Sequence, residues 1–84
     1  MFTAARWYEM ADDSVNLING VNAGTWTLND FATLTQAEKN NMMQRNADVL
    51  TITLAQEEVI DDSGSKTSYT TAITTAETYI SNNS

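Results

Sequence analysis

The residues that come nearest to chemistry by type and spacing are four carboxylates in the stretch EEVIDD, residues 57–62. Glu57 and Asp61 are four positions apart, as are Glu58 and Asp62, so a helix would place each pair on one face. Such carboxylates could hold a divalent cation between them. A solvated acidic helix face explains the same pattern, and we favour that interpretation. We assign no metal, cofactor or catalytic residue.

The composition excludes most other kinds of catalytic site. The chain has 84 residues with no Cys and no His, so it lacks a thiolate nucleophile and the side chain most often used for proton transfer near neutral pH. Carboxylates, hydroxyls and a few basic groups remain. We therefore expect a protein that is not an enzyme. A small hydrolase using carboxylates stays open as a third interpretation, and it would need a buried carboxylate with a raised pKa.

The formal net charge of −7 argues against two classes of partner. The four basic residues, Arg6, Lys39, Arg45 and Lys66, are scattered and form no stripe that could neutralise phosphates. The scarcity of basic residues also weakens the case for binding to an anionic membrane. No stretch of the sequence approaches the roughly 18 apolar residues that a membrane-spanning helix needs. We expect no nucleic-acid partner and no membrane partner.

Apolar residues at spacings of three and four predict helices over about 4–20 and about 66–81. The first helix would bury a face made of Trp7, Met10, Ala11, Ser14, Leu17, Ile18 and Val21, and Gly20 or the NAG at 22–24 would end it. The last would bury Tyr69, Ala72, Ile73, Ala76, Tyr79 and Ile80, capped by Ser65 or Thr67. Between the first helix and the middle of the chain, 25–34 is predicted as a short extended connector.

The middle of the chain poses a choice between helix and strand. Thr35 and Glu38 form a capping box, which starts a helix, and no Gly or Pro interrupts the chain before the DDSGS at 61–65. The alternation in LTITL would suit a strand at 49–54 instead, and Ile52 is the residue that a helix would turn away from its apolar face. We favour one long helix over about 35–62. The prediction is a single all-α domain, 1–84, folded as a three-helix bundle with a long central helix.

A central helix of that length would measure about 40 Å, against about 22–27 Å for its neighbours. Leu, Ile, Val and Phe make up only 16 of the 84 residues, so the core is thin. An overhanging end would expose apolar side chains, which usually marks an interaction site. The candidate interface residues are Phe2, Trp7, Met42, Met43, Ile52, Val59 and Ile60.

Two segments, RNADVLTITLAQEEV and SYTTAITTAETYI, are rich in Thr and Asn and poor in Lys. In this the chain resembles the small acidic helical accessory proteins of tailed-phage particles, which are head decoration or cement proteins and connector or tail components. The resemblance lies in composition and layout, and it implies a structural subunit in the virion, assembled in the host cytoplasm. Its partners would be other capsid or tail proteins, further copies of itself, or both, in a symmetric or homo-oligomeric assembly.

A different class of function is the alternative. A small acidic regulatory or inhibitor module could present its acidic face to a basic, DNA-binding protein. Such binding would weaken with salt, and neutralising Glu57, Glu58, Asp61 and Asp62 would weaken it as well. Docking through apolar surface would depend far less on salt.

Overall fold

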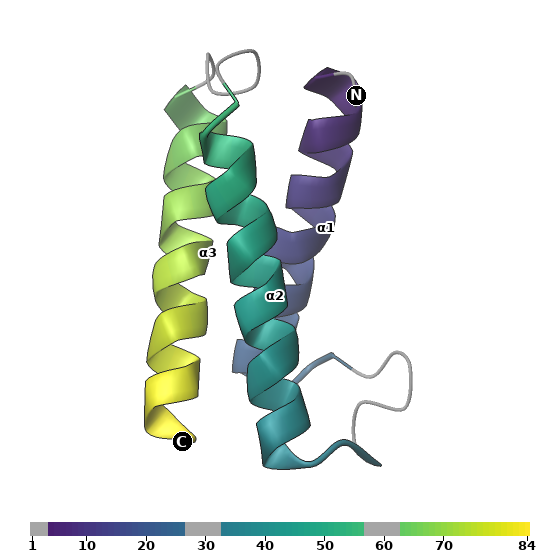
Figure 1. Cartoon of the computed structure of the whole chain (residues 1–84), viewed down its shortest axis with the longest axis vertical. Coiled ribbons are helices and arrows are strands. Elements are labelled where there is room, and N and C mark those ends of the chain that lie inside the picture. Colours follow the sequence, from purple (N-terminus) through teal and green to yellow (C-terminus); the bar gives the residue numbers. More distant parts are fainter. Residues whose placement is uncertain (1–3, 27–32, 57–62) are drawn as a thin grey trace.

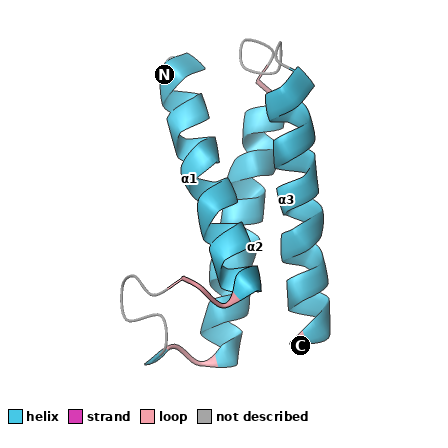
Figure 2. Ribbon diagram, turned by 180° about the vertical axis from the view of Figure 1, so that it is seen from behind, coloured by secondary structure: helices cyan, strands magenta, loops and turns pink. Residues whose placement is uncertain are grey.

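Three helices of nearly equal length form the protein in a computed structural model that describes residues 4–26, 33–56 and 63–84. They are α1 (Ala4–Ala23), α2 (Gln36–Leu54) and α3 (Ser63–Asn82). α2 runs antiparallel to both of the others, and each helix packs against the other two (Figure 1). The described residues contain no strand (Figure 2). The predicted all-α three-helix bundle is confirmed.

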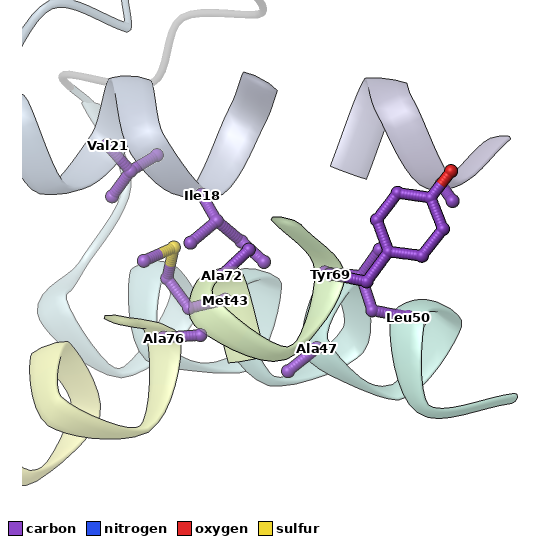
Figure 3. Packing of buried hydrophobic residues seen from close by; sticks show 9 residues of the cluster. Ile18, Val21, Met43, Ala47, Leu50, Tyr69, Ala72 and Ala76 are labelled. Atoms are coloured by element: carbon purple, nitrogen blue, oxygen red, sulfur yellow. The ribbon is translucent and has the colours of Figure 1, made fainter. Parts of the chain in front are cut away.

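The core is made by one stripe on each helix, with buried positions separated by three or four residues. The buried hydrophobic side chains are Ala11, Ile18, Val21, Met43, Ala47, Leu50, Tyr69, Ala72 and Ala76 (Figure 3). Four of these nine are alanines, so the helices pack closely around small side chains. The apolar faces predicted for α1 and α3 supply most of their share of this core.

α1 continues three residues past its expected end and stops at a glycine. Gly24 has a φ of 77°, a left-handed conformation that favours glycine. The amide of Gly24 donates to the carbonyl of Val21 at 3.1 Å, and the amide of Thr25 donates to the carbonyl of Gly20 at 2.9 Å. These two bonds make a Schellman motif. Gly24, within the expected NAG, is therefore the stop, while Gly20 stays helical.

Trp26 folds back onto α1 directly after this stop. A methyl group added at Gly20 would lie 3.1 Å from Cε3 of Trp26, so the bare glycine makes room for the indole ring. The amide of Trp26 also donates to the carbonyl of Gly20 at 3.2 Å. The start of the connector is thus packed against the bundle.

α2 begins at the predicted capping box. The amide of Glu38 donates to Oγ1 of Thr35 at 3.1 Å, and the amide of Thr35 donates to Oε1 of Glu38 at 2.9 Å. Both amides belong to the group that a helix start leaves without intrahelical partners. The backbone amide of Thr35, followed by its hydroxyl, lowers the pKa of the Glu38 carboxyl below its usual value.

The prediction of one long central helix over 35–62 is wrong, because α2 ends at Leu54. Ala55 caps it, and the amides of Ala55 and Gln56 donate to carbonyls three residues back, which tightens the last turn. The helix ends directly after the β-branched run 51–53, which is poor in helix propensity. The strand alternative at 49–54 is also wrong, because α2 includes these residues.

Two further expectations change with these boundaries. The helices have 20, 19 and 20 residues, so α2 is no longer than its described neighbours and the length mismatch expected for the central helix is not found. α3 begins at Ser63, which places Ser65 and Thr67 inside the helix and makes the prediction that one of them caps it wrong. The segment 57–62 lies outside the described residues.

Candidate functional site

α2 carries the one large hydrophobic side chain that is mostly exposed in the described part of the chain. Ile52 is 51% exposed, whereas Leu50 and Thr53 beside it are fully buried. The helix therefore turns Ile52 away from the core, as the sequence predicts. Its neighbours on this side include Val49, which is half-buried, and Ala55, which is exposed. We define the α2 outer face as Arg45, Asp48, Val49, Ile52 and Ala55.

The other candidate interface residues are placed differently. Met43 is fully buried in the core, so the expectation that it contacts a partner does not fit this fold. Met42 is half-buried and packs against the core, and Trp7 is also half-buried. Phe2, Val59 and Ile60 lie outside the described residues. Within the described set, Ile52 is the candidate that presents most of its surface.

The four carboxylates of the acidic cluster, Glu57, Glu58, Asp61 and Asp62, lie outside the described residues. Within the three helices and the described connector residues, no group of three or more His, Cys, Asp or Glu side chains could hold a metal ion. A solvated acidic face therefore stays the prediction for 57–62, with a cation site as its alternative.

A phenol at the boundary of the core joins α3 to α1. Tyr69 is 1% exposed, and its hydroxyl donates to Oδ1 of Asp12 at 3.2 Å. Figure 3 shows the ring lying among the core side chains with its oxygen directed toward α1. Burial, followed by the nearby Asp12 carboxylate, raises the pKa of Tyr69 to about 12. A phenol held neutral in this way is a structural hydrogen-bond donor, because it gives up its proton less readily than a free tyrosine.

A second polar cluster fixes the opposite end of α3 to the start of α2. Nε2 of Gln36 donates to Oη of Tyr79 at 3.2 Å and to Oδ1 of Asn40 at 3.0 Å. Nδ2 of Asn40 donates to the carbonyl of Asn83 at 3.1 Å. These side chains are amides and a phenol without a nucleophile or a strong base. The cluster therefore serves to hold the two helices in register.

Two shallow grooves lie along α3 and share Thr70 and Thr71. One has a volume of about 370 Å³ and is lined by Asn22, Thr70, Thr71, Thr74, Thr75 and Thr78. The other has a volume of about 290 Å³ and is lined by Lys66, Thr67, Thr70 and Thr71. The sequence predicted a capping role for Thr67 and no role for the other threonines. Their spacing of three, one, three, one and three was the signal, since it puts all six on one side of a helix.

Comparison with known proteins finds no match for this chain among protein-family models, curated proteins or solved structures. None of the helices in the described residues is long and apolar enough to cross a membrane.

Proposed function

We propose that this chain is a structural or accessory subunit of a phage particle that docks on a neighbouring protein through the α2 outer face. The observation that carries the proposal is the 51% exposure of Ile52. About half of the Ile52 side chain is already covered by its own chain, so covering the exposed half in an interface contributes roughly half of the about 1.5–3 kcal/mol that full burial of such a side chain gives.

The surroundings of Ile52 support docking on a preformed surface. Leu50 and Thr53 are fully buried on either side of it, so the helix cannot rotate without disturbing the core. Oγ1 of Thr53 donates to the carbonyl of Val49 at 2.8 Å, which further fixes this turn. A surface that is already ordered loses less conformational entropy when it binds.

The particle setting is supported by composition. α2 contains the first ten residues of RNADVLTITLAQEEV, and α3 contains all of SYTTAITTAETYI, the two segments by which the chain resembles small phage accessory proteins. Such a subunit needs a stable shape and a contact surface, and it needs no reaction centre. The bundle supplies the first through its core and the second through the α2 outer face.

The test is whether the chain binds phage particles assembled without it, measured by cosedimentation. Ile52→Gln removes the apolar side chain without adding charge, and we expect it to weaken binding about threefold to tenfold. Thr51→Gln is the matched control, because it places the same side chain at an exposed neighbouring position that points elsewhere. Failure of the wild-type chain to bind particles, or equal binding by both variants, would contradict the proposal.

A second candidate is an acidic module that binds a basic, DNA-binding protein. It is favoured by the exposed Glu9, Asp12 and Asp13 of α1, three carboxylates within five positions. Binding of this kind weakens steeply between low and physiological salt. Neutralising Asp13 to Asn should weaken it further, whereas docking through Ile52 should be nearly unaffected by either change.

A further inference from the structure

We propose that the outward side of α3 is a self-association surface on which α3 of a second copy packs antiparallel across a twofold axis. We call this surface the Thr face, and it consists of Thr67, Thr70, Thr71, Thr74, Thr75 and Thr78. The proposal deepens the oligomeric part of the proposed function by naming a contact, and it uses a different surface from the α2 outer face.

The Thr face lies directly opposite the side of α3 that enters the core. Five of its six threonines are exposed and Thr75 is half-buried, while Tyr69, Ala72 and Ala76 on the other side are buried. Threonine is a poor choice for a solvated helix surface, because its β-branch lowers helix propensity relative to Glu, Lys or Gln. On a surface that packs, the same methyl group gains contacts.

Three of the six hydroxyls of this face already donate hydrogen bonds within the helix. Oγ1 of Thr70 donates to the carbonyl of Lys66 at 2.9 Å, and Oγ1 of Thr74 donates to the carbonyl of Thr70 at 3.2 Å. Oγ1 of Thr75 donates to the carbonyl of Thr71 at 3.0 Å. Since these donors already have partners within the helix, covering them does not leave a buried donor unsatisfied.

The protein contains an example of a threonine buried in this way. Thr53 of α2 is fully buried, and its hydroxyl donates to the carbonyl of Val49 at 2.8 Å. Among the described residues, no buried side-chain nitrogen or oxygen lacks a hydrogen-bond partner. A helix-bonded threonine can therefore pack against another helix of this fold without cost from its hydroxyl.

Charge leaves the Thr face open to a second copy and directs a basic partner elsewhere. Two chains of net charge −7 repel each other, so they can associate only through surfaces that carry little negative charge. The outward side of α1 presents Glu9, Asp12 and Asp13, whereas the six residues of the Thr face are all uncharged. A basic partner would be drawn to the carboxylates of α1 instead.

The edge of the Thr face supplies the charge complementarity that an antiparallel pair requires. Lys66 and Glu77 are 11 positions apart, so they lie on the same edge of the helix, within about 20° of each other and about 16 Å apart along its axis. Their midpoint falls within one residue of the midpoint of Thr67 and Thr78. A twofold axis there brings Lys66 of each copy to Glu77 of the other.

The shape of the surface suits a helix as the partner. The grooves of about 370 and 290 Å³ run along this side of α3 and meet at Thr70 and Thr71. Short side chains allow two helix axes to approach to the lower end of the usual 8–10 Å. A contact of one helix per copy is small, so the dimer forms with a dissociation constant in the micromolar range or weaker.

Sedimentation equilibrium of the full chain, from about 10 μM to about 1 mM, tests the surface. We expect a reversible monomer–dimer equilibrium, strengthened by added salt because salt screens the repulsion between acidic chains. Thr74→Glu places a charge at the centre of the face and should weaken the dimer at least about tenfold. Asn41→Glu adds the same charge at an exposed site of α2 and should change it less than about twofold.

Charge reversal tests the antiparallel arrangement independently. Lys66→Glu and Glu77→Lys should each weaken the dimer about threefold to tenfold, and the double variant should restore it. Glu77→Lys is the decisive variant, because it lowers the net negative charge and would strengthen any association limited only by overall repulsion. Circular dichroism of each variant confirms that the helices are intact.

A chain that stays monomeric to about 1 mM would overturn the inference. So would equal effects of Thr74→Glu and Asn41→Glu, or a stronger dimer with Glu77→Lys. A monomer that binds a basic protein through the Thr face would also overturn it. None of these results bears on docking through Ile52, so the Ile52→Gln experiment can succeed or fail separately.

Discussion

The hydroxyl of Tyr69 donates to Oδ1 of Asp12 at 3.2 Å, and this bond ties α3 to α1 across 57 positions of sequence. Tyr69 is almost fully buried while Asp12 is exposed, so the phenol extends from the core to the surface of the bundle. α1 and α3 pack against each other less extensively than α2 and α3 do. This hydrogen bond therefore adds stability to a pair of helices that pack against each other over a limited area.

Tyr69→Phe should lower the free energy of unfolding by about 1 kcal/mol, since it removes one hydrogen bond and keeps the ring. Urea unfolding followed by circular dichroism measures the change. Tyr79→Phe is the matched control, because the hydrogen bond that Tyr79 accepts from Gln36 is exposed and should contribute less. A larger loss for Tyr79→Phe than for Tyr69→Phe would contradict the assignment.

Alkaline pH should destabilise the fold through Tyr69. Its pKa is raised to about 12 in the folded protein, against about 10 in the unfolded chain, so the folded state holds the proton more tightly. The resulting stabilisation is fully present below about pH 10 and is lost as the pH rises through about 12. Between these values wild type should lose about 2 kcal/mol relative to Tyr69→Phe. Parallel loss in both proteins would show that other groups control the alkaline transition.

The capping box at the start of α2 should be worth about 1 kcal/mol, the typical cost of replacing an N-cap threonine by alanine. Thr35→Ala removes the acceptor for the amide of Glu38 and should lower the urea midpoint. Thr51→Ala is the control, because this exposed position near the end of α2 should gain slightly from the better helix former. Equal changes in the two variants would argue against a specific cap.

The same capping box should make the stability of the fold decrease at acidic pH. The pKa of Glu38 is lowered in the folded protein, so its contribution is present above the unfolded value and disappears as the pH falls through the lowered pKa. Glu38→Gln should reduce the dependence of the unfolding midpoint on pH in this acidic range. An unchanged dependence would place the acid sensitivity in other carboxylates.

The helices could be predicted because their signals are local and repeat. The stripe of Ala11, Ser14, Ile18 and Val21 has the spacing of a buried helix face, and the capping box marks the start of α2. The end of α2 could not be predicted from turn residues, because no Gly or Pro lies between Thr35 and the DDSGS at 61–65. The β-branched run at 51–53 was the available signal, and its effect depends on packing that sequence alone does not show.

The candidate site could be predicted where it depends on helical spacing, and it could not be predicted where it depends on how the helices pack. Ile52 breaks the helical pattern of α2, so its exposure follows once the segment is known to be helical. The burial of Met43 depends on which of two adjacent methionines faces α1 and α3, and helical spacing allowed both Met42 and Met43. The Tyr69–Asp12 bond joins two helices, so its geometry required the packed bundle.

The small side chains of the core make a final prediction about packing. Ala76 is fully buried on α3, and four of the nine buried hydrophobic side chains among the described residues are alanine. Ala76→Leu inserts three carbon atoms where the helices meet, so it should lower the free energy of unfolding by about 1–3 kcal/mol. Ala55→Leu is the matched control, because Ala55 is exposed and the larger side chain meets only solvent. Urea unfolding should show a lower midpoint for Ala76→Leu with an unchanged slope, since the surface exposed on unfolding stays nearly the same. If Ala76→Leu were as stable as wild type, α3 would have to move away from α1 and α2 to admit the side chain, and close packing around alanine would not be what holds the bundle together.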